Sequence, residues 1–339
     1  MAKKVTMDDI AASLNVSKSL VSRALANKYG VNDDTRFKIL LEATRQGYAF
    51  NNSKIKTTRN IDSVTVIMLY ALMADNSYMA TVLEGIEEAL SRKNISCKLK
   101  FLEMDENNVD YPVMYWRLDT SGVIVLGYIT DANLLSLSAT GYPIVLADVQ
   151  NETMLNFDKV MVNNYYGGYT ATQHLLSQGF KRFMYIGASD VGLGFSERFR
   201  GFRDCLERQN DPEISYECLT SPAPRRQPAN IKEVTERLKN GNLPEAIFCA
   251  NDTVAEWTIN ILNDLNVKVP DEVSVMGFDN GNNCEIFEPY ISSVDIPRKD
   301  IGRKAVELLL NRIDNPESPI EFVQLNTTVV QRQSVKLKR

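Results

Sequence analysis

Four polar side chains near the amino end are spaced so that one helical face would present them together. In residues 17–25, SKSLVSRAL, the apolar positions recur three or four residues apart and form one face of a helix. The opposite face carries Lys18, Ser19, Ser22 and Arg23. Hydroxyl, ammonium and guanidinium groups donate hydrogen bonds to phosphate oxygens and to base edges. This face therefore predicts contact with a nucleic acid.

The distribution of charge is compatible with such a partner. Residues 1–60 hold 11 Lys and Arg against 5 Asp and Glu, whereas the rest of the chain holds 27 against 38. A basic head thus precedes an acidic body, although the whole chain has a net charge of -5. A short, periodic basic segment suits a polyanion, because phosphate contacts release counterions. A solvated basic surface is the alternative that charge alone leaves open.

Three short helices are expected to position this face. Thr6 can cap a helix over residues 7–14, Asn15 suits a left-handed turn, and Ser17 can cap the helix that carries the polar face. Asn32 can cap a third helix over residues 33–46. Two such helices joined by a short turn predict a helix-turn-helix module, whose second helix enters the major groove.

This head resembles a known family. The stretches VTMDDIAASLNVSKSLVSRAL and VNDDTRFKILLEATRQGY resemble, without a gap from Val5 to Tyr48, the DNA-binding head of the lactose-repressor (LacI/GalR) family of bacterial transcription regulators. The resemblance implies that phosphates are contacted by Thr6, Ser17 and Ser22, and that bases are read by Lys18, Ser19 and Arg23. Leu20 stands where Thr is usual and Ala26 where Asn is usual. The base preference of the family therefore does not carry over.

Residues 49–62, AFNNSKIKTTRNID, are polar and predict a linker. In the resembled family this segment folds into a hinge helix on DNA, and a leucine wedges into the minor groove. The leucine motif is missing here, so Ile55 is the apolar residue available as a wedge. The alternative is a flexible tether whose basic residues, Lys54, Lys56 and Arg59, touch phosphates.

From Ser63 onward, short β-branched runs alternate with helical patterns. The runs include VTVIMLY, GVIVLG, YPIVLADV, RFMYIGA, EAIFCAN and VSVMGFD. This alternation predicts parallel sheets flanked by helices, in which ligands bind beyond the carboxyl ends of the strands. The polar residues that follow three of these runs are Asp148, Asn251 and Asp279.

The body resembles the sensor of the same family, which shares its fold with periplasmic sugar-binding proteins. The resemblance rests on NSYMATVLEGIEEAL, VNNYYGGYTATQHLLSQGFKRFMYIG, ERFRGF, ANDTVA and VPDEVSVMGFDN. It implies two subdomains with a cleft between them, about 63–163 with 292–325, and 164–291 with 326–339. By position, the effector-contacting residues are Tyr78, Met79, Asp148, Arg198, Asn251 and Asp279. Carboxylate, amide, guanidinium and aromatic groups suit a sugar-like ligand; for each residue, a strand-end cap or an ion pair is the alternative.

The resemblance implies an all-α helix-turn-helix head over 1–48, a linker over 49–62, and an α/β sensor of the periplasmic-binding-protein type (type I) over 63–339. The expected function is that of a sequence-specific regulator, usually a repressor. It would bind operator DNA as a homodimer under the control of a small polar effector. Half-sites would lie about 10–10.5 bp apart or a multiple of that. A solute-binding receptor without DNA function is the competing hypothesis, and a sugar-processing enzyme is a third.

Several classes of protein fit the sequence poorly. There is no apolar run of membrane-spanning length and no secretion signal, so we expect a cytoplasmic protein without membrane contact. The single histidine, His174, is flanked by leucines and predicts packing rather than catalysis. No Ser/His/Asp order, Walker loop or metal-ligand spacing occurs, so no enzyme, cofactor or metal is expected. Five scattered cysteines predict reduced thiols.

Two further features leave alternatives open. Arg225 and Arg226 lie in the loop TSPAPRRQP and could favour an anionic ligand, or could be exposed without a partner. Trp257 occupies a helix position where relatives often have a small residue, and it could anchor an interface or fill the core.

Overall fold

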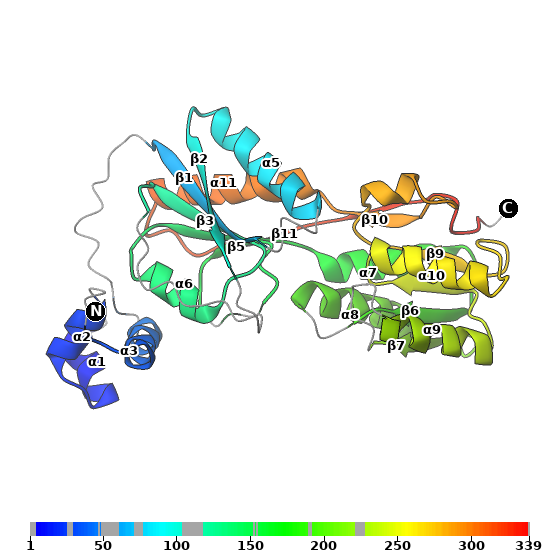
Figure 1. Cartoon of the computed structure of the whole chain (residues 1–339), viewed down its shortest axis with the longest axis horizontal. Coiled ribbons are helices and arrows are strands. Elements are labelled where there is room, and N and C mark those ends of the chain that lie inside the picture. Colours follow the sequence, from blue (N-terminus) through cyan, green and yellow to red (C-terminus); the bar gives the residue numbers. More distant parts are fainter. Residues whose placement is uncertain are drawn as a thin grey trace. The chain divides into compact units, whose positions relative to one another are not determined.

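The computed structural model describes residues 5–25, 30–46, 48, 61–70, 77–103, 118–151, 153, 155–188, 192–220 and 228–337 (Figure 1). The chain divides into two compact units. The first unit comprises Met1–Met161 and Lys299–Val323, and the second comprises Val162–Arg298 and Gln324–Arg339. Ile55 of the expected linker and the loop arginines Arg225 and Arg226 lie outside the described residues.

The head, within the first unit, contains α1 (Met7–Leu14), α2 (Lys18–Leu25) and α3 (Asp33–Arg45). The Thr6 hydroxyl accepts the N–H of Asp9 at 3.3 Å, and the Asp9 carboxylate accepts the N–H of Thr6 at 2.8 Å, which is a capping box. Asn15 ends α1 with φ 50°, and Ser17 accepts the N–H of Leu20 at 3.1 Å. These caps confirm the expected helix-turn-helix boundaries.

A small apolar core holds the three helices of the head together. Its buried residues are Ile10, Ala11, Val21, Ala24, Val31, Ile39 and Ala43. Arg36 of α3 is also buried, and its Nη1 donates to the carbonyl of Ala24 at 3.0 Å. This bond satisfies a carbonyl in the last turn of α2, so α3 fixes the end of α2.

The rest of the first unit is built on a six-stranded sheet with the order β11-β5-β4-β3-β1-β2. Its strands are β1 (Ser63–Leu69), β2 (Ser96–Leu102), β3 (Gly122–Leu126), β4 (Ile144–Ala147), β5 (Asp158–Val162) and β11 (Phe322–Leu325). The pairs from β5 through β2 are parallel. Helices α5 (Ser77–Ser91) and α11 (Arg298–Asp314) cover one face, and α6 (Asp131–Ser138) covers the other (Figure 1).

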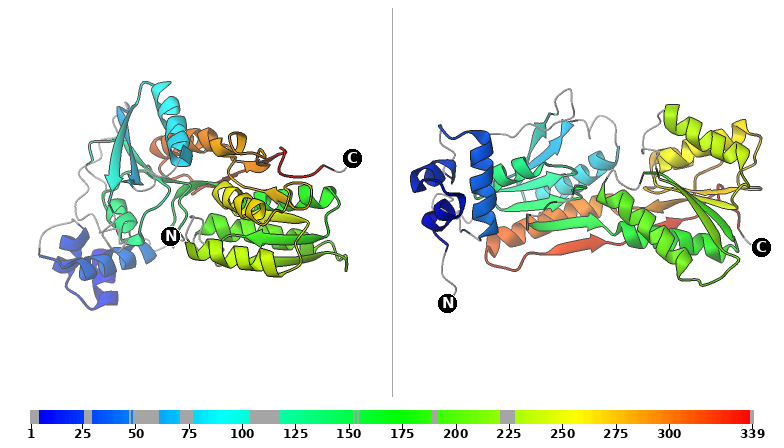
Figure 2. Two further views of the ribbon diagram at one scale, coloured as in Figure 1. Left: turned by 45° about the vertical axis from the view of Figure 1, so that its right-hand side comes forward. Right: turned by 90° about the horizontal axis from the view of Figure 1, so that it is seen from below.

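The second unit contains a four-stranded parallel sheet with the order β7-β6-β8-β9. Its strands are β6 (Arg182–Ile186), β7 (Ser215–Leu219), β8 (Ala246–Cys249) and β9 (Ser274–Met276). An antiparallel pair joins β10 (Ser293–Asp295) to β12 (Thr328–Val330). The helices are α7 (Asn164–Ser177), α8 (Leu193–Glu207), α9 (Pro228–Asn240) and α10 (Asp252–Asp264), with a 3-10 turn at Asn282–Glu285 (Figure 2).

Residues 292–298 lie in the second unit, although the sequence assigned them to the first subdomain. The physical reason is strand pairing. β10 pairs with β12, and Met276 at the end of β9 forms a bridge with Ser292, so both neighbours of this segment belong to the second unit.

The described residues decide the alternative that was open for Trp257. Trp257 is 3% exposed within the core of the second unit, which identifies it as a core residue. His174 Nε2 lies 2.5 Å from Gln331 Oε1, so the single histidine has a structural hydrogen bond. All five cysteines are free thiols. In the part of the chain described here, no helix has the length and apolarity that crossing a membrane requires, and no cluster of metal-ligating side chains occurs.

Candidate DNA-binding face and effector-binding residues

Helix α2 has one buried face and one exposed face, as the sequence predicts. Val21 and Ala24 are buried against α1 and α3. The side chains that project into solvent are Lys18, Ser19, Ser22 and Arg23. Thr6 and Ser17 are exposed too, and their hydroxyls cap α1 and α2. Helix amino termini favour anions, so both caps lie where a phosphate could be bound.

In the first unit, Tyr78 and Asp148 are brought together although they are 70 residues apart. The Tyr78 hydroxyl donates to Asp148 Oδ2 at 2.6 Å. Asp148 follows β4 with φ 47°, and its N–H donates to the carbonyl of Val160 at 2.8 Å. The backbone therefore stays paired to β5 while the carboxylate, 2% exposed, meets Tyr78 at the start of α5. Met79, the next residue, is 5% exposed, so most of its side chain is covered.

In the second unit, three partners fix the orientation of the Arg198 guanidinium. Nε donates to Asn164 Oδ1 at 2.9 Å, and Nη1 donates to the carbonyl of Ala250 at 2.8 Å. Nη2 forms an ion pair with Asp279 Oδ1 at 3.0 Å. The guanidinium carbon also lies 3.8 Å from the centre of the Phe278 ring. Arginine suits this position because its planar group can stack and donate in several fixed directions.

Asp279 lies in the loop after β9, and the buried carboxylate of Asp252 holds this loop in place. Asp279 has φ 104°, and its N–H donates to the carbonyl of Val294 at 3.0 Å. Asp252, the first residue of α10, accepts the hydroxyl of Ser293 at 2.5 Å and the N–H of Gly281 at 2.7 Å. Burial, and then the charge of Asp279, raise the pKa of the Asp252 carboxyl to about 7. The loop after β9 is thus tied to the start of α10.

Asn251 caps α10, since its Oδ1 accepts the N–H of Val254 at 2.9 Å. This is the strand-end cap that the sequence left as an alternative to effector contact. The cap uses the carbonyl oxygen of the amide.

Two glycines allow α7 and α8 to approach closely and so fix Arg198. A Cβ at Gly168 would lie 2.3 Å from the carbonyl oxygen of Arg198, and a Cβ at Gly201 would lie 2.3 Å from that of Tyr165. Such distances exclude any side chain at this crossing unless the helices separate. The guanidinium of Arg198 therefore reaches Asn164 on α7 only because both helices lack a side chain where they cross.

Sequence reasoning missed the residues that orient the arginine. Asn164, Asp252 and Phe278 were not predicted as site residues, although they lie in the stretches VNNYYGG, ANDTVA and VMGFDN, which resemble the family. The signal that could have identified two of them is a polar residue at the start of a predicted helix. Asn163 caps α7, so Asn164 is not needed as a cap, and Asn164 is fully buried.

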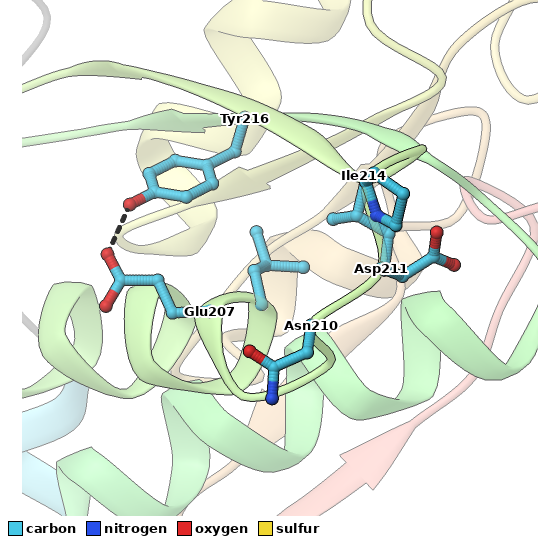
Figure 3. Close-up of a pocket in the computed structure, with 7 residues that line it drawn as sticks. Glu207, Asn210, Asp211, Ile214 and Tyr216 are labelled. Carbon is cyan, nitrogen blue, oxygen red and sulfur yellow. Dashed lines mark hydrogen bonds between the residues drawn. The ribbon is translucent and has the colours of Figure 1, made fainter.

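A surface hollow of about 380 Å³ lies elsewhere in the second unit (Figure 3). It is lined by Leu206, Glu207, Asn210, Asp211, Pro212, Ile214 and Tyr216. Tyr216 donates to Glu207 Oε1 at 2.7 Å across it. The hollow lies beside the end of α8 and the start of β7, so it includes none of the predicted effector residues.

Known proteins resemble both the head and the body of this chain. Residues 172–335 match the family model of a periplasmic binding protein-like domain. The HTH-type transcriptional repressors PurR of Mannheimia succiniciproducens and Photobacterium profundum are 26% and 27% identical to the chain, each over 98% of both proteins.

Solved structures show the same fold. A complex of the transcriptional regulator CelR with cellobiose has a TM-score of 0.68 at 23% identity and covers 98% of this chain and 100% of that one. A LacI family regulator from Enterococcus faecium with bound ribose has a TM-score of 0.67 at 23% identity, over 80% of this chain and 98% of that one. The lac repressor dimer bound to operator and the anti-inducer ONPF has a TM-score of 0.64 at 17% identity, over 98% and 99%.

A helix-turn-helix head followed by a periplasmic-binding-protein-like body defines the class of the protein. Over nearly its whole length the chain is similar to the PurR repressors, and it shares its fold with LacI family regulators of known structure.

Proposed function

We propose that the protein is a sequence-specific DNA-binding transcription repressor, which binds operator DNA as a homodimer and responds to a small polar effector. The head over residues 1–48 binds DNA and a linker over 49–62 joins it to the sensor. The observation that carries the proposal is the exposed face of α2, on which all the side chains are hydrogen-bond donors for phosphates and bases.

The relatives support each part of this function. The PurR relatives, which match over 98% of both proteins, are named transcriptional repressors, and one structural neighbour is a repressor dimer bound to its operator. A role on operator DNA implies a cytoplasmic location and requires no catalysis, so we expect no turnover of any ligand that binds.

We also propose that both clusters of polar side chains contribute to effector binding. In the first unit Tyr78 and Asp148 offer a hydroxyl and a carboxylate, and in the second Arg198, Asn251 and Asp279 offer a guanidinium, an amide and a carboxylate. Such groups suit adjacent hydroxyls of a sugar. Structural neighbours carry ribose and cellobiose, so these two sugars are the first probes.

Replacing Arg23 with Ala tests the DNA-binding face. A duplex enriched from a random pool by the parent chain provides the specific site, and a scrambled duplex provides the reference. Loss of one base contact should lower discrimination between them by about 1–3 kcal/mol, or roughly 5- to 150-fold. Lys38→Ala, which removes an exposed positive charge of α3, is the matched control and should leave discrimination unchanged. An unchanged ratio for Arg23→Ala would refute the assignment of α2.

Thermal-shift measurements test the effector residues. A sugar at about 100 times its dissociation constant should stabilise the protein by about 2.7 kcal/mol. Asp279→Asn should remove this shift, whereas Asp271→Asn, an exposed carboxylate in the same unit, should retain it. Equal shifts in both variants would contradict a role of Asp279 in binding. If the chain bound a sugar but bound no duplex specifically, the alternative of a solute-binding receptor without DNA function would be favoured instead.

A further inference from the structure

One ion pair of the head joins the two helices of the helix-turn-helix. Lys18 Nζ lies 2.7 Å from Asp8 Oδ2, which connects the first residue of α2 to the first turn of α1. The side chains of Lys18 and Asp8 are 61% and 64% exposed. Because both charges remain accessible, DNA can compete with Asp8 for the ammonium of Lys18.

The position of Lys18 is not explained by the stability of α2. The amino end of a helix carries the positive end of its dipole, which favours carboxylates and disfavours an ammonium. The first turn of α2 contains no acidic residue. In α1 the two acidic residues have different partners, because Asp9 completes the capping box with Thr6 while Asp8 pairs with Lys18. Asp8 therefore supplies the negative charge that the start of α2 lacks.

Resting on the proposed DNA-binding function, we infer that Asp8 is a specificity-determining residue that acts through Lys18. A lysine ammonium binds any phosphate as a point charge, and it can also donate to the O6 and N7 of guanine. The ammonium has three N–H donors, so Lys18 can keep Asp8 while it donates to a guanine edge, whose acceptors carry no net charge. A phosphate on the same ammonium would place a second anion beside the Asp8 carboxylate, and the two anions repel each other. Asp8 thus weakens binding to arbitrary DNA more than binding to a site with the correct base.

The salt dependence of binding measures this restraint. Asp8→Asn keeps the shape of the side chain and frees Lys18 to contact a phosphate. On a scrambled duplex the slope of log K against log salt should steepen by about 0.9, so the loss of affinity between 50 and 200 mM salt grows by about 3-fold. The ratio of affinities for the enriched and scrambled duplexes should fall at the same time.

A double-mutant cycle shows whether Lys18 carries the effect. Lys18→Met removes the ammonium, and Asp8→Asn in that background should leave the slope unchanged. Glu42→Gln is the matched control, since it removes one carboxylate of the same head at another place. Glu42 accepts Gln46 Nε2, which also lies 3.0 Å from Ser13 Oγ, at the opposite end of α1 from Asp8. Its slope should equal that of the parent.

Two results would overturn the inference. If Asp8→Asn leaves the slope as in the parent, Asp8 does not restrain Lys18. If it steepens the slope equally in the Lys18→Met background, the carboxylate acts by general repulsion. Both results come from scrambled DNA, so they decide the inference separately from the proposed function, which fails if the parent chain shows no preference for the enriched duplex. Thermal unfolding should be nearly the same in all variants, since an exposed pair contributes little to stability.

Discussion

Arg198 illustrates how one buried charge can hold the polar groups around it in fixed positions. Its guanidinium is 8% exposed and is bound by an amide oxygen, a backbone carbonyl and the carboxylate of Asp279. A buried charge that loses its partner is costly, whereas a paired one can be nearly neutral. The pair therefore fixes the position of Asp279 more than it adds to stability.

Replacing Arg198 with Met should destabilise the second unit by about 3–5 kcal/mol, because Asp279 would lose this ion pair and the buried acceptors on Asn164 and Ala250 would lose their donor. Arg200→Met on the same helix is the control. Arg200 is exposed, with its guanidinium 4.8 Å from the centre of the Tyr165 ring, so its loss should change stability by less than about 1 kcal/mol. Urea unfolding of both variants gives the comparison, and equal destabilisation would contradict the special role of Arg198.

Asp252 predicts a dependence of stability on pH. Its pKa is raised to about 7 in the folded protein, above the value of an unfolded Asp. The protonated form is thus favoured by folding, and its contribution is present at low pH and is lost as the pH rises through about 7. Asp252→Asn, which remains neutral, should gain on the parent by at least about 1.4 kcal/mol between pH 5 and pH 8, the equivalent of one pKa unit.

Hydrogen exchange of the α10 amides, compared between parent and variant at each pH, provides the measurement. Asn can still accept the N–H of Gly281 and donate to Ser293 Oγ, so the loop should stay in place. A difference between the two proteins that stays constant from pH 5 to pH 8 would show that Asp252 does not titrate in this range.

Helix crossings without side chains occur in both units. In the second unit Gly168 and Gly201 lie between α7 and α8. In the first unit, a Cβ at Gly85 would lie 2.2 Å from the carbonyl oxygen of Lys299, and one at Gly302 would lie 2.2 Å from that of Val82. Since α5 carries Tyr78 and α8 carries Arg198, each crossing sets the position of a predicted effector residue.

Gly201→Ala should therefore destabilise the second unit by about 1–3 kcal/mol, although alanine is the better helix former, because its methyl group would overpack the crossing. It should also weaken sugar binding by displacing Arg198. Gly302→Ala is the cross-check, because it should increase hydrogen exchange in α5 and α11 and leave α7 and α8 as in the parent. Normal protection of α7 and α8 in Gly201→Ala would contradict this account of the crossing.

The sequence predicted buried strands well and edge strands poorly. Strands β1, β3, β4, β6 and β8 appear as nearly continuous apolar runs, because parallel strands in the middle of a sheet are buried on both faces. Strand β9 is the last strand of its sheet but is buried as well. The edge strands β2, β7 and β11 carry SCKLKFL, SYECL and FVQL, which are partly exposed and give no such run. Their place in the sheet depends on pairing with distant strands, which local pattern does not contain.

The same distinction holds for the predicted sites. The faces of α2 follow from local periodicity and were predicted correctly. Tyr78 and Asp148 were each predicted as effector residues, but the hydrogen bond between them was not predicted. Asn164 and Asp252 could not be recognised, because their roles depend on Arg198 and on Ser293, which are far away in the chain.

The two parts of the chain differ in charge, and this difference bears on how the whole molecule meets DNA. Residues 1–60 carry an excess of 6 positive charges and the remainder an excess of 11 negative charges. A polyanion is attracted to the first part and repelled by the second. We therefore expect DNA contact to be confined to the head and linker, with the sensor acting on affinity from a distance.

Such control has a consequence that two titrations can check. If a sugar changes the affinity for the enriched duplex by some factor, that duplex must change the affinity for the sugar by the same factor. The two factors should agree when each is measured on the intact chain. Unequal factors at equilibrium would show that sugar and DNA do not bind one linked system.

Binding of the purified full-length chain to its enriched duplex, relative to a scrambled duplex of the same composition at physiological salt, tests the central claim most directly. The account predicts a preference of at least about 1,000-fold, with one dimer on each two-half-site duplex. Equal affinity for the two duplexes, with and without the sugars that bind, would contradict it.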